Sequence, residues 1–207
     1  MAKPKCVDNQ WQCPLLNVFE EIEQTCDGLD NDCDGDGDED VTTTYYADTD
    51  GDGLADKVTT FVDGLNIPMG LYPYKNGVIA FSIPYIWFFE DTNGDGKSDQ
   101  RTKLYGPMGF ERGAHGLNNS FRRGFDGWIY ANHGFNNETA VKGADGHTIR
   151  MQSGNTYRFR PDGSRIEQFT WGQVNPFGAT FDELGNLFTA DCHSKPIYQL
   201  LRGGYYP

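Results

Sequence analysis

A nine-residue acidic motif occurs twice in this chain and sets a period for the rest of the sequence. The first copy, DTDGDGLAD, begins at Asp48, and the second, DTNGDGKSD, begins 43 residues later at Asp91. Both copies fit the pattern D-T-[DN]-G-D-G-x-x-D. Blades of a β-propeller repeat at about 40–45 residues. The spacing therefore predicts a β-structure built from repeated units.

The same motif carries the side chains of a calcium loop. Oxygen-bearing residues at positions one, three, five and nine, together with the backbone carbonyl of position seven, can surround one cation, and glycine at position six allows the bend. Hard oxygen ligands favour Ca²⁺ over zinc or copper. The predicted ligands are Asp48, Asp50, Asp52, Leu54 (carbonyl) and Asp56 in the first loop, and Asp91, Asn93, Asp95, Lys97 (carbonyl) and Asp99 in the second. The alternative is a pair of Asp-Gly turns without metal.

Cysteines cluster near the start of the chain. Cys6, Cys13, Cys26 and Cys33 lie within the first 33 residues, whereas Cys192 stands alone. In an acidic calcium-loop context, this cluster favours two disulfides and an oxidising compartment, with the pairing left open. Reduced thiols are the main alternative, and a zinc site is less favoured because no C-x-x-C pair or nearby histidine accompanies the cysteines.

A third acidic stretch lies between these cysteines. The sequence CDGLDNDCDGDGDED, Cys26 to Asp40, resembles the cysteine-bracketed metal-binding motif of secreted bacterial proteins. The resemblance implies a further calcium loop with ligands among alternating aspartates: Asp30, Asp32, Asp34, Asp36 and Asp38. Residues 1–41 are therefore predicted to form a small calcium-binding segment, and residues 42–207 the repeated β-domain.

Charge and hydropathy exclude several partners. The 207 residues carry a net charge of −13, which disfavours binding to nucleic acid and to anionic membranes. No apolar run of about 18 residues occurs, so no transmembrane helix is predicted. The first ten residues lack the apolar core of a signal peptide, so either export information lies outside this chain or its start is not the natural one.

After Thr42, alternating segments separated by turn residues predict strand after strand. The expected strands are Thr42–Tyr46, Val58–Val62, Met69–Tyr74, Gly77–Ser82, Tyr85–Glu90, Arg101–Tyr105, His115–Arg122, Trp128–Asn132, Thr156–Arg160, Arg165–Thr170, Phe177–Phe181, Asn186–Ala190 and Ile197–Leu201. A polar excursion, 134–152, interrupts them. Four-stranded units beginning near Gly70, Gly116 and Gly178 predict an all-β partial β-propeller of three to four blades, with an incomplete ring that is truncated at the C-terminus. A β-sandwich is the alternative.

Blade geometry brings several polar residues to one face. His115 begins an inner strand, Asn175 precedes one, and His133, Asp191 and His193 follow second strands. Loops at these ends share one face near the propeller axis, so a histidine beside Asp191 and Asn175 could act as a general base. The alternative is that each histidine only bonds neighbouring blade loops. The calcium loops fall on the opposite face and are expected to be structural.

Two stretches carry a resemblance to a known family. HGLNNSFRRGFDGWIYANHGFNN (115–137) and GQVNPFG (172–178) lie within a span, 45–207, that resembles the membrane-bound dehydrogenase propellers of planctomycete-type bacteria. The span is more distantly similar to soluble quinoprotein glucose and sorbosone dehydrogenases. This resemblance implies that His115 is the catalytic base and that 172–178 is a cofactor loop in which Asn175 binds the cofactor.

The resemblance also implies cofactors and partners. It points to Ca²⁺ and pyrroloquinoline quinone, but the arginine of the cofactor loop is Val174 here, which removes a fixed cation for a quinone carboxylate. No C-x-x-C-H haem motif occurs in the sequence, so a haem domain or redox partner is expected outside this chain.

We therefore expect an extracellular or periplasmic, calcium-stabilised propeller of a sugar or alcohol dehydrogenase-like protein. Under this hypothesis, His115 takes a proton from a substrate hydroxyl while a redox cofactor accepts hydride. One alternative is a non-catalytic propeller that binds carbohydrate or a protein partner. Another is a calcium-dependent adhesive surface protein led by residues 26–56.

Overall fold

The structure is a computed structural model that describes residues 5–7, 10–12, 59–114 and 116–207. The chain divides into two units, 1–58 and 59–207. In the first unit, β1 (Lys5–Val7) and β2 (Gln10–Gln12) pair as an antiparallel ribbon. The expected strand Thr42–Tyr46, three of the clustered cysteines and the predicted ligands between 30 and 56 lie outside the described residues. The domain boundary after residue 41 stays a prediction.

The second unit is built from three antiparallel meanders, which confirms the predicted all-β class. Among residues 59–114 and 116–207 there is no helix, and hence none long and apolar enough to cross a membrane. The first sheet contains β3 (Met69–Tyr74), β4 (Gly77–Ser82), β5 (Tyr85–Glu90) and β6 (Gln100–Tyr105). The second contains β7 (Asn119–Arg123), β8 (Ile129–His133), β11 (Asn155–Phe159) and β12 (Ile166–Gln168), and the third β13 (Pro176–Phe181), β14 (Leu187–Asp191) and β15 (Ile197–Leu200).

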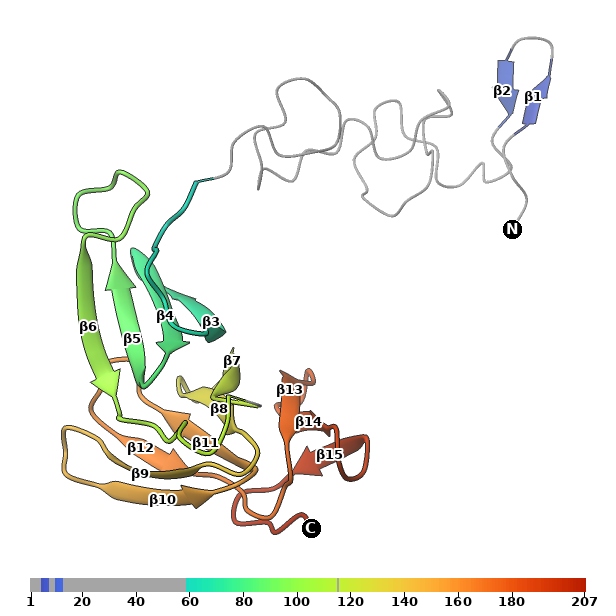
Figure 1. Cartoon of the computed structure of the whole chain (residues 1–207). Coiled ribbons are helices and arrows are strands. Elements are labelled where there is room, and N and C mark those ends of the chain that lie inside the picture. Colours follow the sequence, from blue (N-terminus) through green and yellow to red (C-terminus); the bar gives the residue numbers. More distant parts are fainter. Residues whose placement is uncertain (1–4, 8–9, 13–58, 115) are drawn as a thin grey trace. The chain divides into compact units, whose positions relative to one another are not determined.

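The sheets are arranged as blades. Their first strands, β3, β7 and β13, gather at the centre of the unit, whereas β6, β12 and β15 lie at the outside (Figure 1). Strand β7 contacts both β3 and β13. The described part of the chain is thus a partial β-propeller whose blades do not close a ring.

Two apolar cores hold the blades together. In β4 and β5, alternate residues such as Ile79, Phe81 and Ile86 point to one face because side chains alternate along a strand. They join Phe121 and Phe159 of the second blade in the larger core. A smaller core joins the second blade to the third. Its buried residues are Trp128, Tyr130, Phe169, Ala179, Leu187 and Leu200.

Two expectations about secondary structure were wrong. The polar excursion between the second and third strands of blade two contains a hairpin, β9 (Glu138–Lys142) and β10 (Thr148–Gln152). Its inward residues, including Val141, Ile149 and Met151, are buried in the larger core. Conversely, residues 59–62 of the predicted strand Val58–Val62 are not a strand. The Phe61 carbonyl instead accepts a hydrogen bond from the Ser98 backbone at 2.8 Å.

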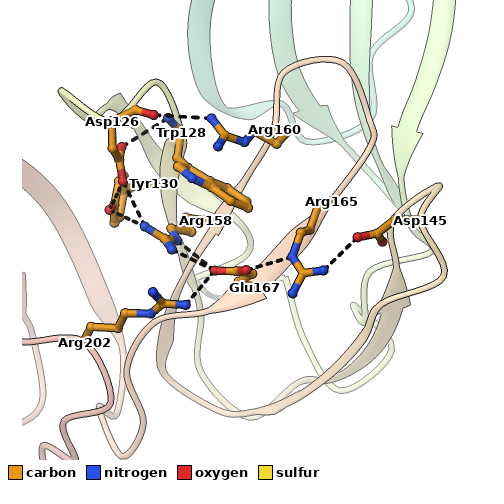
Figure 2. Close-up of polar contacts among 9 residues, drawn as sticks. All are labelled: Asp126, Trp128, Tyr130, Asp145, Arg158, Arg160, Arg165, Glu167 and Arg202. Carbon is orange, nitrogen blue, oxygen red and sulfur yellow. Dashed lines mark hydrogen bonds and ion pairs between the residues drawn. The ribbon is translucent and has the colours of Figure 1, made fainter.

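A charged network joins the second blade to its neighbours (Figure 2). Arg158, on β11, donates to Asp126 at 2.9 Å and to Glu167 at 2.8 Å. Glu167 also accepts from Arg202, which follows β15 in the third blade, at 3.0 Å. Arg165 connects Glu167 to Asp145 in the β9–β10 turn. The network therefore fixes the hairpin and the third blade to the outer part of the second.

Candidate functional site

The loop before β13 is held by a carboxylate at the end of β14. Asp191 accepts backbone hydrogen bonds from Val174 at 2.9 Å through Oδ2 and from Asn175 at 3.1 Å through Oδ1. Oδ1 also accepts from the backbone of His193 at 3.1 Å. Asp191 is 5% exposed. Because both of its oxygens bind backbone N–H groups, this carboxylate fixes the shape of the loop 172–176.

Asn175 then joins three segments of the chain. Its Oδ1 accepts a hydrogen bond from the backbone of Phe135 at 3.2 Å, just after β8. Its Nδ2 donates to Sγ of Cys192 at 3.2 Å, just after β14. A side chain on Gly116, which has a φ of 70°, would collide with the Asn175 amide. Asn175 is buried at the meeting point of the loops that follow β8 and β14 and the segment that precedes β7.

Gly134 brings two of these segments into direct contact. A side chain at Gly134 would overlap the carbonyl of Gly116, so only glycine permits this approach of one backbone to the other. Gly116 follows His115 in the chain. His115 itself lies outside the described residues, and its role stays a prediction.

The open side of this cluster carries the remaining candidates. Cys192, a free thiol, and His193 are exposed. The His193 ring lies 5.9 Å, centroid to centroid, from the ring of Phe135, which is 40% exposed. Residues Asn175, Asp191 and His193 are thus brought together, with an aromatic ring and a thiol at the edge. We call this arrangement the axial cluster: Gly116, Gly134, Phe135, Asn175, Asp191, Cys192 and His193.

His133 directly precedes Gly134 and Phe135 of the axial cluster, but its side chain lies in a different environment. It ends β8 and is 1% exposed. Its Nδ1 lies 2.8 Å from the carbonyl of Ser153, which only accepts, so the ring proton is on Nδ1. Its Nε2 lies 2.7 Å from the Thr139 hydroxyl, which then donates to it. Burial lowers the pKa of His133, and the hydrogen bond to Ser153 opposes this only in part. The neutral ring ties β8 to the β9–β10 hairpin.

The second acidic loop is where the sequence predicts it, in the turn between the third and fourth strands of blade one. Asp91 accepts backbone hydrogen bonds from Gly94 at 2.7 Å and from Gly96 at 2.8 Å. These bonds, that from Gly96 above all, lower the pKa of Asp91. Asp95 accepts from Lys97, and Asp99 accepts from Thr92.

These contacts fold the loop around its predicted ligands. The carboxylates of Asp91, Asp95 and Asp99 accept hydrogen bonds from backbone N–H groups of the same loop. Within residues 59–114 and 116–207, no three acidic, histidine or cysteine side chains converge as a metal centre. The donor set is of the right chemical type for Ca²⁺ because all of its atoms are oxygens. Calcium binding at 91–99 stays a prediction.

Sequence reasoning missed Phe135, Thr139 and Ser153. Phe135 contributes a backbone N–H and an aromatic ring to the axial cluster, and the other two residues hold His133. A Gly-Phe pair directly after a predicted strand was the available signal for Phe135. No sequence signal pointed to Thr139 or Ser153, because their contacts with His133 depend on the β9–β10 hairpin.

Several solved structures share limited similarity with this chain. A glucose dehydrogenase is 14% identical, with a TM-score of 0.38 and 72% of this chain covered. A luciferin-regenerating enzyme is 11% identical, with a TM-score of 0.36 and 69% covered. The PQQ-bound form of an aldose sugar dehydrogenase from Streptomyces coelicolor is 16% identical, with a TM-score of 0.33 and 72% covered. The match spans 64% of each of these proteins.

No curated protein matches the chain. A family model does match, over residues 29–206, and the match includes the acidic loops at 48–56 and 91–99 and all three blades. The chain therefore belongs to the family described as "Domain of unknown function (DUF7133)".

Proposed function

We propose that the axial cluster binds a sugar or another polyol, and that this propeller belongs to a dehydrogenase-like protein that oxidises a hydroxyl of that ligand. The observation that supports this most is the position of Asn175. Its side chain contacts the segments that follow β8 and β14 and packs against Gly116, the neighbour of His115. Convergent polar groups beside an aromatic ring are typical of sites for small polar ligands.

The proposed roles follow from the contacts. His115 is the base that removes a proton from the reacting hydroxyl. Asp191 has both oxygens occupied by backbone N–H groups, so it positions the loop and is not the base. Phe135 and His193 form the exposed edge against which the carbon face of a sugar ring could pack. His133, which is buried and neutral, holds the end of β8 through its hydrogen bonds with Ser153 and Thr139.

Oxidation of a hydroxyl also requires a two-electron acceptor. A quinone cofactor would supply that chemistry, but Val174 places an apolar side chain where the related loop has an arginine. The described residues of this loop therefore do not fit the quinone carboxylate well. Calcium at the acidic loops, export from the cell, and kinship with membrane-bound dehydrogenase propellers are parts of this same proposal.

A reconstitution assay tests the proposal. The purified protein is supplied with Ca²⁺ and an artificial two-electron acceptor, with and without pyrroloquinoline quinone, and is assayed with a panel of aldoses and alcohols. We expect turnover that is lost in His115→Gln and kept in His147→Gln, a control in the exposed β9–β10 turn. No turnover with any substrate, with the protein folded and calcium present, would contradict the oxidoreductase assignment.

A second candidate is a propeller that binds carbohydrate without chemistry. Val174 favours it because a binding site needs no quinone. Sugar binding measured by calorimetry, without turnover and unaffected by His115→Gln, would support this candidate. The third possibility, a calcium-dependent adhesive protein, rests on residues 26–56, which lie outside the described residues. Loss of calcium-dependent cell attachment on deletion of residues 1–41 would support it.

A further inference from the structure

A groove lies at the outer rim of the propeller, between the first and second blades. Its volume is about 410 Å³. One wall comes from Tyr85 and strand β6, and the other from the β9–β10 and β11–β12 turns, which lie near the end of β6 in Figure 1. The lining residues are Tyr85, Thr102–Gly106, Lys142–Ala144, Asp162 and Gly163. Because β6 is the outermost strand of its blade, this groove is separate from the axial cluster.

The walls of the groove are fixed to one another. The Tyr105 hydroxyl lies 2.8 Å from the Arg160 carbonyl and 2.9 Å from the Arg165 carbonyl, which ties the end of β6 to the second blade. The two turns are joined by a backbone hydrogen bond of 3.1 Å from Ala144 to Gly163. The groove is therefore formed where the first and second blades pack against each other.

Two lysines give the groove a positive character. The Nζ atom of Lys103 lies 4.1 Å from the centre of the Tyr85 ring, which holds the ammonium group at the groove. Lys142, at the end of β9, lines the opposite wall. In the part of the chain that the structure describes, neither lysine has a carboxylate within 4.0 Å. By contrast, Arg158 and Arg165 nearby are both paired.

One carboxylate also lines the groove. Asp162 accepts a backbone hydrogen bond from Ser164 at 2.9 Å, and its remaining acceptor capacity is available to a hydroxyl donor. The lining thus carries two cations and one anion in a protein whose net charge is −13. A local excess of positive charge on so acidic a chain marks a place where an anion is attracted.

We propose that this groove binds an acidic monosaccharide unit, with a sugar carboxylate between Lys103 and Lys142. The volume falls within the usual range for small-molecule sites, about 300–1,000 Å³. The two ammonium groups match a carboxylate, whereas Asp162 and the Thr102 hydroxyl match sugar hydroxyls. A simple inorganic anion would use only the lysines. The combination therefore favours a uronic acid over either a neutral sugar or a bare anion.

Isothermal titration of the whole chain with glucuronate tests this inference, with glucose as the uncharged control and sodium sulfate as the inorganic control. Lys103→Met and Lys142→Met remove the charges and keep apolar stems of similar length. Lys75→Met is the matched control, because the Lys75 ammonium also lies over a tyrosine ring, 5.2 Å from the centre of Tyr74, but outside the groove.

We expect glucuronate to bind more tightly than sulfate, and each groove variant to weaken glucuronate binding about tenfold while its melting temperature stays unchanged. Any glucose binding belongs to the axial cluster and should be the same in the groove variants and the wild type. The Lys75→Met variant should bind as the wild type does, and added salt should weaken binding. Equal affinity for sulfate would overturn the saccharide assignment. No glucuronate binding, or binding unchanged in both groove variants, would overturn the site. The readout is binding alone, so the result is independent of any oxidoreductase activity.

Discussion

Arg158 donates two hydrogen bonds to one oxygen of Glu167, 3.1 Å from Nε and 2.8 Å from Nη2. The Arg158 guanidinium also packs over the Trp128 ring at 4.5 Å, and that of Arg160 covers the same indole at 4.1 Å. Figure 2 shows Glu167 between Arg158, Arg165 and Arg202. One carboxylate therefore holds three cations that come from two blades.

Replacing Glu167 with glutamine should destabilise the propeller by about 3 kcal/mol. The change leaves Arg158, whose side chain is 11% exposed, with Asp126 as its remaining carboxylate, and it also takes a charged partner from Arg165 and Arg202. Removing the anion at the centre of a partly buried network leaves these cations undercompensated. Urea unfolding measures the loss. Glu183→Gln, on the exposed β13–β14 turn, is the control and should change stability little. Equal stability of the Glu167 variant and the wild type would show that the network is not holding the blades.

Acid should weaken the contacts between Glu167 and its three arginines as the pH falls from about 4.5 towards 2. Burial alone would raise the pKa of Glu167, but hydrogen bonds and charge from Arg158, Arg165 and Arg202 lower it from 4.5 to about 2. Because the folded pKa lies below the unfolded one, the contribution is complete above pH 4.5 and disappears as the pH falls towards 2. Melting temperatures measured from pH 6 to pH 2 should fall, and the fall should be shallower in Glu167→Gln. Parallel curves for the two proteins would contradict this.

His133 should remain neutral in the folded protein. Burial lowers its pKa below the usual 6.5, so the unfolded chain takes up the proton more readily. Its contribution to stability is therefore complete above about pH 6.5 and declines as the pH falls below that value. Nitrogen NMR of the imidazole rings should find the His133 proton on Nδ1 at pH 7. A protonated His133 ring at that pH, or a proton on Nε2, would contradict the contacts with Ser153 and Thr139.

Asp191→Asn should loosen the loop that carries Asn175. The amide Nδ2 cannot accept the hydrogen bond that a carboxylate oxygen accepts from the backbone of Val174 or Asn175. An unsatisfied buried N–H costs about 1–3 kcal/mol, and amide hydrogen exchange at Val174 and Asn175 should accelerate. Asp182→Asn is a matched control, because Asp182 accepts from the backbone of Leu184 in an exposed turn. Unchanged exchange at the loop would show that the carboxylate is not required.

Calcium titration should detect the loop at 91–99. Asp91 is fixed by Gly94 and Gly96, and its lowered pKa keeps it ionised at neutral pH. Asp91→Ala should therefore reduce the number of bound Ca²⁺ per chain by one in calorimetry, without affecting the other acidic loops. The same stoichiometry in the variant and the wild type would mean that this turn is a hairpin without metal.

The sequence predicted strands well where folding signals are local. Strands β3, β4 and β5 begin and end at the predicted residues because two short turns, Lys75-Asn76 and Ile83-Pro84, separate the apolar segments. The β9–β10 hairpin was missed because its apolar residues are few and its exposed face is polar. Predicted strand 115–122 begins later, at Asn119, because the approach of Gly116 to Gly134 replaces pairing there.

The candidate site was predictable only in part. Asn175, Asp191 and His193 could be placed together because blade topology brings strand ends to one face. The partners that give each residue its role could not be read from the sequence. Asp191 binds backbone groups 16 and 17 residues away, and His133 depends on Ser153, 20 residues away in a turn beside the unpredicted hairpin. Tertiary contacts of this kind leave no periodic signal.

The most direct test of the proposed site uses Cys192, the exposed thiol beside Asn175 and His193. Alkylation of this cysteine is followed by peptide mass spectrometry with and without a saturating sugar or polyol that the protein binds or oxidises. Our account predicts that the ligand slows alkylation of Cys192 and that Asn175→Ala abolishes this protection. A ligand that binds or turns over while Cys192 reacts at an unchanged rate would place the site elsewhere and contradict the account.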